Sequence, residues 1–102
     1  AVRVFGKKID AVFGGNDTIA MGVMQYGHEQ SIDIPGDLGL AGYDDIDQAG
    51  MLHVPLTTVH QPKFELGVKA AEVLMAEIRK PSAIKQKIIL QPQLVIRKSC
   101  GE

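Results

Sequence analysis

The chain has 102 residues, of which 45% are hydrophobic and 23% charged, and this composition is typical of one soluble globular domain. Its 11 basic and 12 acidic residues give a formal net charge of −1. That balance excludes a dedicated nucleic-acid surface, because phosphate binding requires a clustered basic footprint. No apolar run approaches the roughly 20 residues of a membrane span, and no signal segment opens the chain. We therefore expect a cytoplasmic location and no membrane contact.

The first predicted elements are a strand and a helix. The apolar run from Ile9 to Gly14 ends in Gly14-Gly15, a pattern typical of a buried strand that turns directly into a helix. The pattern from Val2 to Asp10 leads into this strand without a cap or a turn cluster, so we expect further sequence upstream. The helix should extend to about Gln30, with an apolar stripe formed by Ile19, Val23 and Tyr26.

A turn at residues 34–37 (IPGD) precedes a second buried strand, predicted from Leu38 to Tyr43. A strand, a helix and a second strand form a βαβ unit, which makes the two strands parallel neighbours in a sheet. The predicted fold class is therefore α/β, with a Rossmann-like parallel sheet flanked by helices.

The second half of the chain predicts a helical connection over Ile46 to Val54, a third strand over Leu56 to His60 and a long helix over Phe64 to Arg79. Pro62 suits the first turn of that helix, and Pro81 ends it. The tail predicts short strands at residues 88–90 and 94–96, or one interrupted strand. The single cysteine, Cys100, has no disulfide partner and is expected to be exposed.

Two polar pairs, Asn16-Asp17 and Asp44-Asp45, follow the first two predicted strands. In open α/β sheets, ligands bind beyond the carboxyl ends of the strands, so these pairs are expected to meet at one rim. Either Asn16 or Asp17 could cap the following helix, with capping the preferred role for Asp17, and Asp44-Asp45 also fits a turn or a cap.

Four motifs resemble the C-terminal half of the lactose-repressor (LacI/GalR) family of bacterial transcription regulators: FGGNDTIAMG at 13–22, IPGDLGLAGYDD at 34–45, PLTTVHQP at 55–62 and LVIRKS at 94–99. The resemblance implies two Rossmann-like lobes around a sugar cleft, as in type I periplasmic binding proteins. Residues 1–102 would then be an incomplete C-terminal part of the effector-binding and dimerisation domain. The helix over 64–79 would pack with the missing N-terminal lobe or with a partner chain.

The same resemblance implies that Asn16 and Asp44 bind the effector, a sugar or polyol, with Asp44 accepting hydrogen bonds from its hydroxyls. Asp45 remains a predicted cap. The resemblance also implies a homodimer or higher oligomer, and we assign Met21, Met24, Met51 and Leu52 to its interface. A second layer of core is the alternative place for Met21 and Met24. Operator DNA would be bound by an N-terminal helix-turn-helix outside this segment.

The predicted function is thus a ligand-controlled switch of operator affinity, without catalysis or cofactor. A periplasmic sugar-binding protein of a transport system is the alternative, because it shares the fold. An enzyme would have to use Asp44-Asp45 for magnesium or Gly14-Gly15 for phosphate, yet GxxxxGK[ST] and GxGxxG motifs are absent. We expect no metal site, because the three histidines, His28, His53 and His60, lack the spacing and partners of metal ligands.

Overall fold

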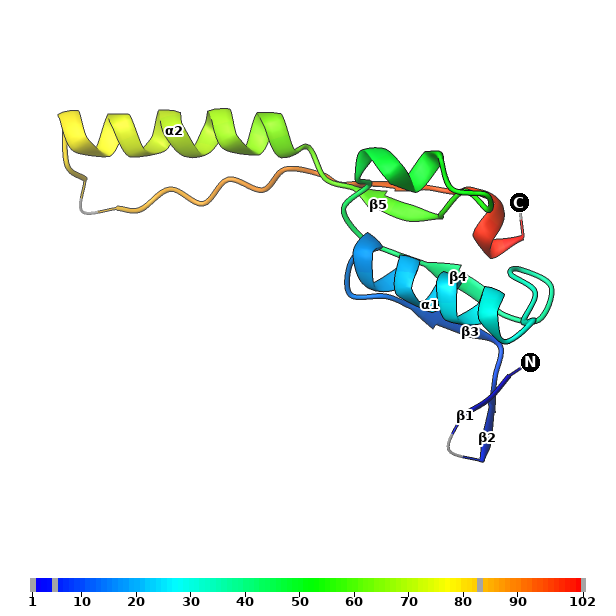
Figure 1. Ribbon diagram of the computed structural model, residues 1–102. Coiled ribbons are helices and arrows are strands. Elements are labelled where there is room, and N and C mark those ends of the chain that lie inside the picture. The colour runs from blue at the N-terminus through cyan, green and yellow to red at the C-terminus, as the bar shows by residue number, and fades with distance from the viewer. Residues whose placement is uncertain (1, 5, 83, 102) are drawn as a thin grey trace. The chain divides into compact units, whose positions relative to one another are not determined.

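The structure is a computed structural model that describes residues 2–4, 6–82 and 84–101. It divides into two compact units, one formed by Ala1–His60 with Gln93–Glu102 and the other by Gln61–Pro92 (Figure 1). Within the described ranges, no helix is both long and apolar enough to span a membrane.

A parallel pair of strands organises the first unit. Strand β3 (Ala11–Phe13) lies parallel to β4 (Gly39–Ala41), with Val12 opposite Leu40. The helix α1 (Asp17–Glu29) joins them and packs against β4 (Figure 1). The predicted parallel arrangement and the α/β class are confirmed, because both short apolar runs are paired and a helix connects them.

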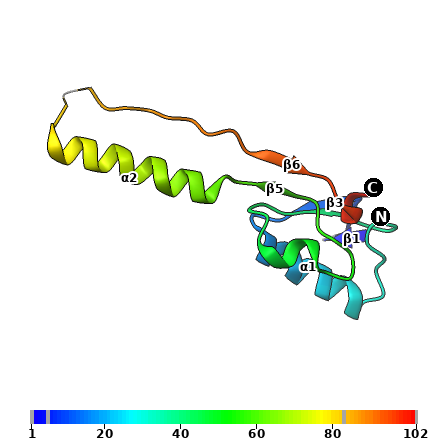
Figure 2. The same ribbon diagram turned by 90° about the horizontal axis from the view of Figure 1, so that it is seen from above.

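Strand β5 (Thr58–His60) extends this arrangement beyond β4. Parallel bridges join Ala41 to Thr57 and Asp44 to His60, and strand β6 (Gln93–Val95) pairs antiparallel with β5 (Figure 2). The predicted strand near 94–96 is confirmed, whereas residues 88–90 lie outside any strand. The 3₁₀ helix η2 (Lys98–Cys100) follows, and Cys100 is exposed as expected.

Two local predictions were incomplete. The first strand pattern is a hairpin of β1 (Val2–Val4) and β2 (Lys7–Ile9), which turns near Gly6 with a φ of 75°. Glycine adopts such a φ at no steric cost, so Gly6 was a turn signal that the sequence prediction missed. The helical connection expected over Ile46 to Val54 is only the 3₁₀ helix η1 (Asp47–Gly50).

The core of the first unit depends on small residues of α1. Ala20 is fully buried and Gly27 is buried, whereas Ile19 and Tyr26, two of the three residues of the predicted stripe, are 55% and 59% exposed. That part of the prediction was wrong because the helix lies close to the end of β3, where a Cβ on Gly14 would be only 3.0 Å from the Ala20 backbone nitrogen. The buried hydrophobic residues are Ala20, Ile34, Leu38, Leu40, Ala49 and Leu56.

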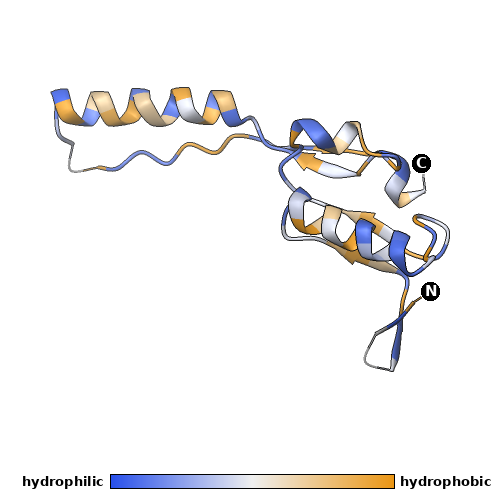
Figure 3. Cartoon of the chain, in the orientation of Figure 1, coloured by the Kyte–Doolittle hydropathy of each residue, from blue (hydrophilic) through white to orange (hydrophobic). Residues whose placement is uncertain are grey.

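The second unit is a long helix with an extended segment. The helix α2 (Lys63–Arg79) starts one residue before the predicted helix, and Pro62 is its N-cap rather than part of its first turn. The chain then runs back along the helix in extended form (Figure 2). Apolar positions recur along α2 (Figure 3), yet none of its residues is buried, and Phe64 is 88% exposed.

We expect Leu40→Ala to lower the free energy of unfolding by about 2–5 kcal/mol, because it leaves a cavity at a fully packed position. Ile19→Ala should change that free energy by less than about 0.5 kcal/mol, since the Ile19 side chain is largely in solvent. Urea unfolding followed by circular dichroism measures both. Equal losses in the two variants would contradict the assignment of the core.

Candidate functional site

The carboxyl ends of β3 and β4 meet, as the sequence predicted. The Gly14 amide donates to the Ala41 carbonyl at 2.8 Å, and the Asp17 amide donates to the Tyr43 carbonyl at 3.0 Å. Asn16-Asp17 and Asp44-Asp45 are therefore neighbouring segments of one rim.

Asn16, not Asp17, caps α1. Its backbone is extended, with a φ of −155°, and its Oδ1 accepts a hydrogen bond from the Ile19 amide at 2.8 Å. The capping role predicted for Asp17 was wrong, because Asp17 is already the first residue of the helix. The cap uses only the oxygen of the half-buried Asn16 amide, so its Nδ2 is a donor that capping does not require.

Asp17 instead connects three segments from inside the unit. Its side chain is fully buried; Oδ1 accepts from the Thr58 hydroxyl at 2.6 Å, and Oδ2 accepts from the Ile46 amide at 2.9 Å. A Cβ at Gly42 would collide with Asp17 Oδ1 and would lie 3.0 Å from a methyl group of Leu56. The carboxylate thus occupies space that only glycine leaves open.

The segment after β4 has an unusual backbone. Asp44 and Asp45 both have positive φ, 115° and 54°, a conformation that costs a residue with a side chain on the order of 1–3 kcal/mol. The Asp44 amide donates to the Val59 carbonyl at 2.9 Å, and the Asp45 amide donates to the Thr58 hydroxyl at 3.3 Å. Strand β5 therefore holds this turn in place, with Asp44 half-buried at its start.

The Asp45 side chain forms an ion-pair network rather than a cap. Its Oδ1 accepts from Arg97 Nη1 at 2.9 Å, and its Oδ2 lies 2.9 Å from His60 Nδ1. Burial raises the pKa of Asp45, but hydrogen bonds and positive charge from Arg97 and His60 outweigh it, so the pKa lies below its ordinary value. The predicted cap was wrong, because the N-cap of η1 is Ile46 and has no side-chain bond.

Sequence reasoning missed Arg97 and His60 as part of this rim. Arg97 also donates to the Leu56 carbonyl at 3.0 Å. The next turn is fixed by Ser99, whose buried hydroxyl donates to the Leu40 carbonyl at 2.6 Å and accepts from the Thr57 amide at 2.8 Å. The LVIRKS motif at 94–99 contains Arg97 and Ser99, and it was the available signal for these two residues.

Three of the four predicted interface residues line one groove of about 760 Å³ on the first unit: Met21, Met24 and Leu52. Met24 and Leu52 also pack against the core, whereas Met51 lies outside the groove lining and is 75% exposed. Within the part of the chain that the structure describes, no group of three or more His, Cys, Asp or Glu side chains could hold a metal ion.

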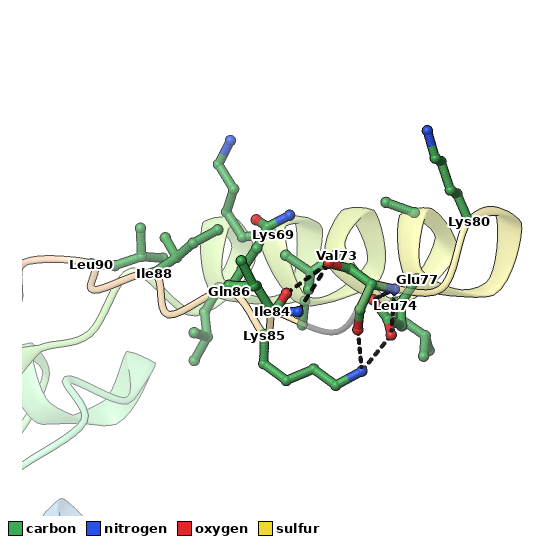
Figure 4. A pocket seen from close by; sticks show the side chains of 14 residues that line it. Lys69, Val73, Leu74, Glu77, Lys80, Ile84, Lys85, Gln86, Ile88 and Leu90 are labelled. Carbon is green, nitrogen blue, oxygen red and sulfur yellow. Dashed lines mark hydrogen bonds and ion pairs between the residues drawn. The ribbon is translucent and has the colours of Figure 1, made fainter.

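The second unit has a groove of its own, about 470 Å³ in volume, between α2 and the returning segment (Figure 4). Its apolar lining includes Leu66, Val73, Ile84 and Ile88, and an ion pair joins Lys85 to Glu77. Apolar side chains dominate this groove, which distinguishes it from the polar rim of the first unit.

The chain is similar to known proteins over nearly its whole length. The sequence profile of the periplasmic binding protein-like domain matches residues 3–100. The chain belongs to this family. Within it, the relatives are regulators of the LacI family: the ribose operon repressor of Escherichia coli (strain K12) is 45% identical over 89 residues, which are 87% of this chain and 27% of the repressor.

Solved structures of LacI-family regulators agree with the periplasmic binding protein-like fold. A putative regulator from Sanguibacter keddieii superposes with a TM-score of 0.88 at 29% identity, over 95% of this chain and 38% of that one. A regulator from Enterococcus faecium with bound ribose gives a TM-score of 0.84 at 33% identity, over 91% of this chain and 35% of that one. The chain thus spans less than two fifths of the length of these proteins.

We expect Gly42→Ala to lower the free energy of unfolding by about 1–3 kcal/mol, because the new methyl group would collide with the buried Asp17 carboxylate. Gly22→Ala is the matched control, since a Cβ there meets nothing within 4 Å and alanine favours the helix by about 0.5–1 kcal/mol. Thermal melts of both variants measure the difference. A Gly42→Ala protein as stable as wild type would show that the Asp17 network tolerates displacement.

Proposed function

We propose that the chain is the C-terminal part of the effector-binding and dimerisation domain of a DNA-binding transcription regulator, and that its effector is a sugar or a related small polar molecule. The observation that carries this proposal is the polar rim: Asp44 is held at the end of β4 beside Asn16 at the end of β3. Ligands of open α/β sheets bind at such a rim.

The chemistry of the rim suits a polyol. A carboxylate such as Asp44 has two oxygens that accept hydrogen bonds from two adjacent hydroxyls, and such charge-assisted bonds are roughly twice as strong as neutral ones. The Asn16 amide supplies a donor for a sugar oxygen. The ribose bound to the Enterococcus faecium regulator and the name of the ribose operon repressor support a sugar as the effector class.

The remaining parts of the regulator would lie outside the 102 residues. The chain spans 27% of the ribose operon repressor, so a second lobe and an operator-binding head have room elsewhere in a protein of that length. We propose that the exposed apolar face of α2, with Phe64, Met75 and Ile78, packs against that lobe or a partner chain. Effector binding between the lobes would then change operator affinity in the cytoplasm.

Two other classes fit less well. A periplasmic sugar-binding protein shares the fold, but the relatives and solved structures reported above are regulators or repressors. An enzyme has no support from those names either. The function proposed is therefore binding and signalling without catalysis.

We expect Asp44→Ala, made in the full-length regulator, to weaken effector binding by something like 2–5 kcal/mol if the carboxylate is desolvated in the complex. Asp44→Asn keeps the shape but loses the charge, so it should bind with intermediate affinity. Calorimetric titration with D-ribose and related sugars measures the affinity, beside a thermal melt. Operator binding without effector should survive in both variants.

Two results would contradict a role of Asp44 in effector binding. Unchanged sugar affinity in both Asp44 variants would remove Asp44 from the site. A collapsed melting temperature would instead assign Asp44 a structural role in the turn.

We propose further that the groove of Met21, Met24 and Leu52, with the exposed Met51 beside it, is covered by a second copy of the chain. We expect a dimer at tens of micromolar protein and at least a tenfold weaker dimer in Met21→Lys, because a buried lysine at an apolar contact loses hydration. Ile19→Lys is the control, because Ile19 is exposed on the same helix but does not line the groove. Sedimentation equilibrium that finds wild type monomeric would refute the interface.

A further inference from the structure

Two sets of contacts hold the turn after β4: backbone hydrogen bonds from the amides of Asp44 and Asp45 to β5, and side-chain contacts of Asp45. Asp44 and Asp45 are consecutive non-glycine residues with positive φ, and each would relax to a more favourable conformation if the turn were free. A residue proposed to bind ligand through two hydroxyl contacts must nevertheless have a fixed position. A side chain that strengthens the hold of β5 on this turn, without itself contacting ligand, would therefore raise affinity.

We propose that Asp45 is the positioning residue of the effector site: its ion pair with Arg97 and its hydrogen bond with His60 hold the left-handed turn that places Asp44. This inference rests on the proposed function, because it assigns Asp45 a role in the affinity of that same site. Asp45 would act through the backbone that it shares with Asp44 and not by touching the effector.

The Asp45 carboxylate is suited to an anchoring role. Both carboxylate oxygens of Asp45 are engaged within the protein, Oδ1 by Arg97 Nη1 and Oδ2 by His60 Nδ1, each at 2.9 Å. The Asp45 side chain is only 16% exposed. A carboxylate that is already paired on both oxygens is poorly suited to bind sugar hydroxyls, but well suited to fix the peptide beside it.

The anchors come from different parts of the unit. His60 is the last residue of β5, and Arg97 is the N-cap residue of η2 just after β6. Arg97 is itself held, because Nη1 also donates to the Leu56 carbonyl at 3.0 Å and its backbone amide donates to the Thr57 hydroxyl at 2.8 Å. The ion pair thus connects the strained turn to strands that the sheet already fixes.

The expected loss of affinity depends on how much of the time the turn adopts the conformation that can bind the effector. If the turn without its anchor spends only a tenth of its time in the binding-competent conformation, the apparent Kd rises tenfold, although no effector contact is lost. The same substitution should have little effect on affinity once the Asp44 carboxylate is gone, because there is then no carboxylate to position. A purely structural residue would lower stability without this dependence on Asp44.

The test is calorimetric titration of the full-length regulator with D-ribose, followed by other pentoses, hexoses and disaccharides if ribose gives no heat. We expect Asp45→Asn to raise the Kd on the order of tenfold, and less than twofold when it is added to Asp44→Ala, which removes the contact that Asp45 would position. Asp47→Asn is the matched control, since Asp47 is exposed two residues further along, and its Kd should equal that of wild type. Far-UV circular dichroism verifies that each variant is folded.

The outcomes separate this inference from the proposed function. Asp45→Asn that binds like wild type, or that weakens binding equally with and without the Asp44 carboxylate, overturns the positioning role and leaves the proposed function intact. A wild-type protein that binds none of these sugars overturns the proposed sugar effector, and the positioning role with it.

Discussion

The buried Asp17 carboxylate is the contact on which the arrangement of the first unit depends. It begins α1, yet it accepts hydrogen bonds from the Ile46 amide and from the Thr58 hydroxyl, in the loop after β4 and in β5. A buried carboxylate without such partners would be very costly, so the fold is stable only when these three segments meet. Gly42 makes the meeting possible by leaving space for the carboxylate.

The stiffness of the rim follows from this contact. Thr58 donates to Asp17 and also accepts from the Asp45 amide, so the same hydroxyl connects the buried carboxylate to the strained turn. Hydrogen bonds arranged in such a chain hold their members more firmly than isolated pairs do. If the rim binds a ligand as proposed, a rim that is fixed beforehand has less conformational entropy to lose on binding, which favours affinity.

The sequence was sufficient for features that depend on near neighbours. Apolar runs ending in Gly14-Gly15 and at Tyr43, joined by a helical segment, predicted the parallel β3–β4 pair, and the pattern from Phe64 to Arg79 predicted α2. The meeting of the two polar pairs at one rim was also predicted correctly. Each of these predictions starts from a pattern within one short segment of the sequence, such as an apolar run, a turn residue or a helical period.

The errors concern residues whose environment is set by distant segments. An aspartate near the start of a helix is easily taken for a cap. Its actual role depends on Thr58, 41 residues away, whose hydroxyl donates a hydrogen bond to the buried Asp17 carboxylate. Asp45 depends in the same way on His60 and Arg97. The buried face of α1 was misjudged because hydropathy ranks Ile19 above Ala20, whereas close packing on the sheet selects the smaller side chain. The roles of Asn16 and Asp44 in binding remain predictions.

His60 lies beside the rim and is also the last residue of the first unit before the chain leaves it. The chain leaves the first unit after His60 and returns to it at Gln93, and these two residues are paired opposite one another in β5 and β6. The same His60 pairs with the Asp45 carboxylate beside the proposed effector contact. In the proposed regulator, an effector that engages Asp44 would therefore act on the turn next to the point where the chain crosses to α2. A change in that turn would reach β5 directly, through the hydrogen bonds of the Asp44 and Asp45 amides and the contact between Asp45 and His60, without having to pass through the core.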